Sequence, residues 1–238
     1  MNQDEKDTID AAHRELRGVE RDGRPARALV IERTYATTVD DVWDAITNAE
    51  RIPRWLLPIE GDLHVGGKYQ LQGNASGEIL TCDAPRHLAV TWEFGGSVSW
   101  VDVHLSDDPE GTRLRMEHVA LLADIAMFDQ FGPGAVGIGW DLTFLGLTHH
   151  LRTGEAVPSP EGEGAGGPDP EFLARSSEAW CEADIASGTP EDKARAGAAA
   201  VLAMYTGGGG EGGPEGAGAE GAEGDAAAGG DDGEPAAG

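Results

Sequence analysis

Short strand-like runs separated by turn residues occupy the chain between residues 60 and 119, and they constrain the fold more than any other feature. Most connections carry glycine or proline, as at Gly66-Gly67, Ala84-Pro85 and Gly95-Gly96. Parallel strands need crossovers of about a dozen residues or more, so links this short predict an antiparallel sheet. Six runs follow one another, at about 60–64, 67–72, 77–83, 86–95, 97–106 and 111–119.

Further elements frame this meander. The run ALVIERTY at 28–35 alternates as another strand, and short helices are expected at 38–46 and 48–55. An apolar helix from about 134 to 151 follows the last strand. One long helix is the element available to cover the curved sheet, and such a helix seldom fills the concave face completely. We therefore predict an α+β domain at 27–153, with a curved antiparallel sheet wrapped around a long C-terminal helix and a cavity between them.

The segments outside this domain differ in composition. Residues 1–24 are polar, and we expect them to be disordered or weakly helical. Residues 155–168 have the Pro/Gly/Glu composition of a linker. Two favoured helix starts, Asp169-Pro170 and Thr189-Pro190, predict a helical hairpin at 169–206 that docks on the domain because it is too small to fold alone.

The last segment, 207–238, consists mainly of glycine, alanine and acidic residues. It holds eight Asp and Glu residues and no Lys or Arg. Too little apolar surface is available there to offset the entropy of ordering, so a disordered tail is expected.

Charge and cysteine usage narrow the class of protein. The chain carries 17 basic and 43 acidic residues, a formal net charge of −26, which disfavours nucleic acid and anionic membrane surfaces as partners. No apolar run approaches the ~20 residues of a membrane-spanning helix, and the N-terminus does not read as a signal peptide. Cys82 and Cys181 are far apart and favour packed thiols in a reducing compartment. A cytoplasmic protein is the simplest interpretation.

An ordered series of motifs resembles the START-like, helix-grip or SRPBCC, superfamily, and within it proteins similar to the activator of Hsp90 ATPase. The series covers about 27–153, and its order is more specific than any single element. It reads Val42-Trp43-Asp44-Ala45, Trp55, Val65-Gly66-Gly67-Lys68-Tyr69, Leu88 to Trp92-Glu93, Gly111-Thr112-Arg113-Leu114 and Gly139-Trp140.

This resemblance implies a domain with an internal pocket. Members of the superfamily bind lipids, sterols, polyketides or other apolar molecules, and some are cyclases or hydrolases. The family's namesake acts on a chaperone ATPase. What the resemblance implies for this chain is therefore a small hydrophobic ligand, a chaperone partner, or an enzyme for aromatic or polyketide-like substrates.

Strand and helix periodicity nominates the residues of the expected cavity. Each could instead be ordinary core packing, but as a group they offer flat apolar walls for a pocket of about 300–1,000 Å³. By the same alternation, Trp100, Asp102 and His104 face outward. The apolar candidates are Trp55, Tyr69, Trp92, Phe94, Met116, Trp140 and Phe144.

Two polar residues share the inward faces. Arg33 alternates with Ile31 and Tyr35, so it could anchor a ligand carboxylate, or else extend to the sheet edge and pair with a neighbouring acid. His118 follows Met116 inward and could be a polar contact, an acid/base group or a hydrogen-bonded core histidine.

Catalytic and metal-binding patterns are not evident in the sequence. His149 and His150 are adjacent, so they point in different directions from a helix and do not chelate as an i, i+4 pair would. No catalytic residue, cofactor or metal site is nominated. We expect a non-catalytic binding protein for a small apolar or amphipathic molecule, with an Hsp90-type ATPase activator and a cyclase- or hydrolase-like enzyme as the alternatives.

Overall fold

The structure, a computed structural model, describes residues 1–125, 127–157 and 168–207. Its core is an eight-stranded sheet in which every neighbouring pair is antiparallel, in the order β1-β2-β8-β7-β6-β5-β4-β3. The predicted α+β class and helix-grip fold are confirmed. The strands are β1 (His13–Arg21), β2 (Arg24–Tyr35), β3 (Ile59–Gly61), β4 (Lys68–Leu71), β5 (Ser76–Asp83), β6 (His87–Phe94), β7 (Ser97–Asp108) and β8 (Gly111–Leu121).

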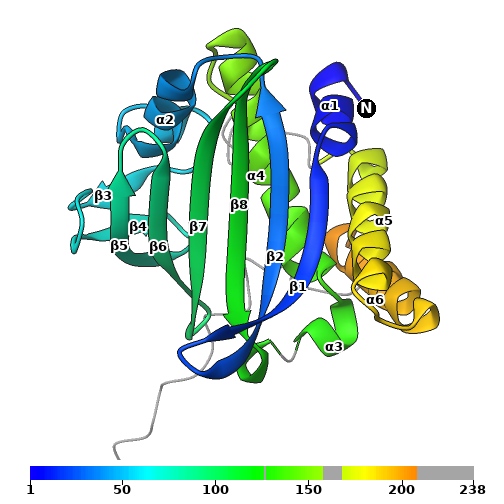
Figure 1. The fold of residues 1–238 in the computed structure, drawn as a ribbon. Coiled ribbons are helices and arrows are strands. Elements are labelled where there is room, and N and C mark those ends of the chain that lie inside the picture. The colour runs from blue at the N-terminus through cyan, green and yellow to red at the C-terminus, as the bar shows by residue number, and fades with distance from the viewer. Residues whose placement is uncertain (126, 158–167, 208–238) are drawn as a thin grey trace, which may run out of the picture.

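Helix α4 covers one face of this sheet (Figure 1). It begins after Pro133 and ends before Gly154, whose positive φ of 72° lets its N–H bond to the carbonyl of His150. Buried side chains of the sheet and of α4 form the central cluster, among them Ile31, Leu114 and Phe144. The α-helices are α1 (Gln3–Asp10), α2 (Val39–Thr47), α3 (Met127–Phe131), α4 (Gly134–Thr153), α5 (Pro170–Ala186) and α6 (Glu191–Tyr205), with 3₁₀ turns at Ile52–Arg54 and Leu122–Asp124.

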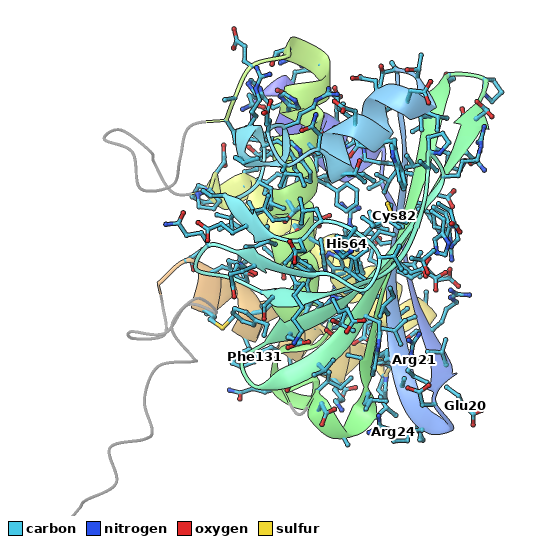
Figure 2. All side chains as sticks on the ribbon, turned by 90° about the vertical axis from the view of Figure 1, so that its left-hand side faces the viewer. Glu20, Arg21, Arg24, His64, Cys82 and Phe131 are labelled. Atoms are coloured by element: carbon cyan, nitrogen blue, oxygen red, sulfur yellow. The ribbon has the colours of Figure 1, made fainter. Side chains whose placement is uncertain are left out.

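The first 24 residues correct the sequence-based expectation of a disordered or weakly helical segment. They form α1 and then β1, which pairs along its length with β2 and adds an edge to the sheet. The tip of this hairpin carries Glu20, Arg21 and Arg24 (Figure 2). The expectation was wrong because the partners that order this segment are distant: Asp4 accepts hydrogen bonds from Arg152 of α4, and Leu16 is buried in the central cluster.

Helices α5 and α6 lie side by side and pack against α4 and, through α5, against β1 (Figure 1). Trp180 of α5 is fully buried, and it fits against α4 because Gly137 has no side chain. Most of the expected linker and nearly all of the expected acidic tail lie outside the described residues, at 158–167 and 208–238.

Candidate functional site

A cavity of about 170 Å³ lies between the sheet and α4. Its walls come from α2, the following 3₁₀ turn, β3 to β8 and α4, so residues far apart in the sequence meet there. This volume is smaller than the expected 300–1,000 Å³, but a dry cavity of about 150 Å³ is enough to bind benzene. The indoles of Trp92 and Trp140 occupy part of the space, with ring centroids 5.0 Å apart.

Six of the nine residues nominated from the sequence line this cavity. They are Trp55, Tyr69, Trp92, Met116, Trp140 and Phe144. Whether they bind a ligand stays a prediction. The convergence of the five that lie on strands and on α4 follows from strand parity and helical spacing, whereas Trp55 directly follows the 3₁₀ turn Ile52–Arg54. Their neighbours in the lining are mostly leucine, isoleucine and valine side chains.

The polar groups of the cavity wall are turned into the protein. Trp55 Nε1 donates to the carbonyl of Ala45 at 2.8 Å, and the Tyr69 hydroxyl donates to the carbonyl of Thr91 at 2.8 Å. Burial raises the pKa of Tyr69, which keeps this hydroxyl protonated. The hydroxyls of Thr47 and Thr143 each donate to the backbone carbonyl four residues earlier. The cavity therefore presents ring faces and aliphatic groups more than free hydrogen-bonding groups.

His118 supports the cavity wall from behind and is absent from the lining. Trp140 Nε1 donates to His118 Nδ1 at 2.9 Å, so the ring proton of His118 resides on Nε2. That nitrogen donates to Ser99 Oγ at 2.7 Å, and Ser99 in turn donates to the carbonyl of Trp92 at 3.0 Å. Burial lowers the pKa of His118 to about 4, so the imidazole is neutral near pH 7. Of the readings left open, the geometry matches the hydrogen-bonded core histidine.

Arg33 is not in the cavity lining and fits neither reading drawn from the sequence. It is buried and donates a hydrogen bond from Nη1 to Thr148 Oγ1 at 2.8 Å. Its guanidinium carbon lies over the ring of Tyr35, 4.6 Å from the ring centroid. Burial raises the pKa of Tyr35 to about 12, the Arg33 charge opposing the shift. Thr148 also accepts a hydrogen bond from Thr8 of α1 at 3.3 Å, and Arg33, Tyr35 and Thr148 are all absent from the cavity lining.

Phe94 is the nomination that the structure contradicts most directly. It is 40% exposed and does not line the cavity. It shares the parity of Trp92, but it is the last residue of β6, where burial has already ended. Alternation along a strand predicts on which face of the sheet a side chain lies. It does not predict whether other parts of the protein cover that position.

Several lining residues were not nominated. Val101 and Val103 alternate with the outward residues of β7 and could have been found by that rule. Ile79 and Cys82 both line the cavity although they are three residues apart on β5. The register of β5 on β6 shifts between Ile79 and Thr81, which turns Cys82 to the same side, and strict alternation does not predict such a bulge.

A second depression, of about 460 Å³, lies on another side of α4. Its wall includes Leu142 and Leu145 together with Asp4 and His149. His149 Nδ1 lies 3.0 Å from an Asp4 oxygen, and the hydrogen bond from Arg152 is the main cause that lowers the pKa of Asp4. Because Asp4 already interacts with both His149 and Arg152, the aromatic cavity is the better candidate site.

Comparison with known proteins identifies the family of the chain. Residues 36–152 match the family model described as activator of Hsp90 ATPase homolog 1-like protein. CalU16 from Micromonospora echinospora is 33% identical in its solution structure, with a TM-score of 0.61 over 75% of this chain and 97% of that protein. The chain belongs to this family of the SRPBCC superfamily.

A second structure of CalU16 and a more distant protein were also compared with the chain. The crystal structure of CalU16 is 32% identical, with a TM-score of 0.57 over 73% of this chain and 98% of that one. EF2215 from Enterococcus faecalis, a conserved protein of unknown function, has the same fold at 14% identity, with a TM-score of 0.54 over 78% of this chain and 97% of that one. No curated protein matches the chain. Over the described residues, none of the helices has the length and hydropathy needed to cross a bilayer.

Proposed function

We propose that this SRPBCC domain binds a small, apolar, ring-containing molecule in the cavity between the sheet and α4. The observation that carries the proposal is the chemistry of the wall. The two indoles of Trp92 and Trp140 offer ring faces, and the hydrogen-bonding groups of Trp55, Tyr69 and Trp140 are satisfied within the protein. A ligand that enters leaves none of these groups unpaired, and it gains from burying its own apolar surface.

Binding is favoured over catalysis by the composition of the lining. The residues that line the cavity include no Asp, Glu, His, Lys or Arg. His118, the nearest titratable ring behind the wall, has both nitrogens engaged and is neutral near pH 7. General acid–base catalysis needs a proton-transfer group within hydrogen-bond reach of the substrate. The wall offers the Cys82 thiol and the Tyr69 hydroxyl, and the Tyr69 hydroxyl already donates to the carbonyl of Thr91.

The test is a titration with benzene, which matches the cavity volume, followed by NMR of the tryptophan indole N–H groups. We expect saturable shifts at Trp92 and Trp140. Trp100 serves as an internal control because it lies outside the cavity lining, with Arg21 over its ring at 4.5 Å. Its resonance should not move.

Two variants of α4 sharpen the test. Phe144→Trp adds volume inside the cavity, and it should weaken benzene binding while the domain stays folded. Leu142→Trp adds the same ring on the side of α4 that faces the second depression, and it should leave benzene binding intact. If benzene causes no saturable shift and Phe144→Trp only destabilises the domain, the cavity is a packing feature. A surface-acting role, such as the activation of a chaperone ATPase, would then take its place.

A further inference from the structure

Three side chains with metal-ligating atoms meet on the outer face of the sheet, where β6 and β7 pair. His87 of β6 and His104 of β7 are direct cross-strand partners, and Asp102 lies two residues before His104. Their strand neighbours Leu88 and Val103 line the cavity, so alternation places all three on the opposite face of the sheet. This cluster is therefore separate from the ligand cavity.

The three side chains converge on one point. His104 Nε2 lies 2.7 Å from Asp102 Oδ1, and His87 Nε2 lies 3.2 Å from the same carboxylate. The two imidazoles are stacked, with ring centroids 4.2 Å apart and planes inclined by 9°. One ligand atom from each residue can be chosen so that all lie within 4.8 Å of one another.

These distances suit the coordination of a single metal ion. In a tetrahedral zinc site with bonds of ~2.0–2.1 Å, neighbouring ligand atoms are about 3.3 Å apart. The 3.2 Å distance from His87 Nε2 is close to this spacing, and the 2.7 Å distance from His104 Nε2 is a hydrogen-bond length that has to lengthen when an ion enters. Small side-chain rotations would provide this and would let the stacked imidazoles lean toward a shared ion. We propose that His87, Asp102 and His104 form a binding site for a divalent transition metal ion such as Zn²⁺. Two imidazoles and one carboxylate suit Zn²⁺, Ni²⁺ or Cu²⁺ better than Mg²⁺ or Ca²⁺.

The surroundings favour a cation at this position. Arg115 is the cross-strand partner of His104 on β8, but its charge is offset by Glu117 at 2.9 Å and by Glu32 at 3.5 Å. The chain as a whole carries a net charge of −26. The three side chains are 28–54% exposed, so an ion reaches them without any opening of the domain. Three protein ligands leave a further position for water or for a group of another molecule.

The experiment is a calorimetric titration of the full, untagged chain with ZnCl₂, because a polyhistidine tag would itself bind the metal. The titration is carried out in a non-chelating buffer that contains excess Mg²⁺. The Mg²⁺ competes with zinc for sites made of carboxylates alone, including those of the acidic segment at 207–238. We expect about one Zn²⁺ per chain. His87→Gln and His104→Gln should each weaken binding roughly tenfold or more, since even the loss of an outer-shell partner has an effect of that size.

His64→Gln is the matched control. It removes a histidine of the β3–β4 connection (Figure 2) that is not part of the cluster, and zinc binding should be unchanged. Far-UV circular dichroism confirms that each variant is folded. A second readout is the visible absorption of the Co²⁺-loaded protein, which should be lost in His104→Gln and kept in His64→Gln. The proposal is overturned if the parent binds no zinc, or if the double variant His87→Gln/His104→Gln binds it with unchanged stoichiometry and affinity.

Discussion

Trp140 of α4 donates a hydrogen bond of 2.9 Å from its indole nitrogen to Nδ1 of His118 on β8. The bond joins α4 to the sheet. It holds the indole of Trp140 in a position where the ring forms part of the cavity wall beside Trp92. His118 continues the chain of hydrogen bonds through Ser99 to the backbone carbonyl of Trp92, so one network ties the indole of Trp140 to β6.

Removing the donor should weaken the domain. Trp140→Phe keeps a ring in the wall but leaves Nδ1 of His118 buried without its donor. We expect a loss of about 1–3 kcal/mol in the free energy of unfolding, measured by urea denaturation. Thr143→Ser, on the same helix, keeps the hydroxyl and removes only a methyl group, so it should cost less. Equal losses in the two variants would show that the His118 bond contributes little.

His118 should also make stability depend on pH. The histidine has a pKa of about 4 in the folded protein and about 6.5 when unfolded, so between these values the unfolded chain binds more protons. Stability therefore rises with pH from about 4 to 6.5, by roughly 3 kcal/mol in all, and this contribution is lost as the pH falls through that window.

The variant His118→Gln isolates this effect from the many carboxyl groups that titrate at low pH. The difference in unfolding free energy between parent and variant should change across pH 4 to 6.5 and be constant above it. His64→Gln, which removes an exposed histidine, should show no such change. A flat difference for His118→Gln would mean that His118 is not held neutral.

Two glycines of α4 should respond in opposite directions to the same substitution. A Cβ at Gly137 would lie 2.4 Å from the ring of Trp180, whereas a Cβ at Gly139 would meet only Tyr205 Oη at 3.6 Å. Gly139→Ala should stabilise the helix by up to about 1 kcal/mol through helix propensity. Gly137→Ala should lower the melting temperature because the rigid, fully buried indole has to move. A similar gain in both variants would show that α5 does not pack on α4 as described.

The buried pair of Arg14 and Asp141 offers a double-mutant test of how β1 is held. Arg14 donates two hydrogen bonds to Asp141 Oδ1, at 2.9 and 3.2 Å. Burial raises the pKa of Asp141, and the Arg14 guanidinium opposes that shift. Arg14→Leu should cost about 3–5 kcal/mol because it leaves a buried carboxylate without its cation. Adding Asp141→Leu should recover part of the loss in denaturant unfolding, whereas strict additivity would show that the two residues do not interact.

Much of the fold could be predicted from the sequence because its signals are local. Alternation along β6, β7 and β8, short turns between them and the apolar helix at 134–151 are each set by residues close in the chain. The cavity aromatics followed from the same periodicities. What could not be predicted depends on distant partners: β1 is ordered by pairing with β2 and by Arg14, and Arg33 is placed by Thr148 of α4. Tertiary packing also sets two further details. The inner face of the sheet is no longer covered at Phe94, and a bulge in β5 turns Cys82 toward the cavity.

The hydrogen-bond partners of Asp141 lead to an expectation about the relatives of this chain. Besides Arg14, its carboxylate accepts hydrogen bonds from Ser176 Oγ at 2.5 Å and from Trp180 Nε1 at 3.0 Å. All three donors lie outside residues 36–152, the stretch that the family model matches, although the carboxylate itself lies inside it. Such a group is costly to keep without its donors, so the four positions should be gained and lost together in evolution. An aspartate at this place in the closing helix would then mark a lineage within the family that carries both the extra edge strand and the appended helices, while members without those additions should have an apolar residue there.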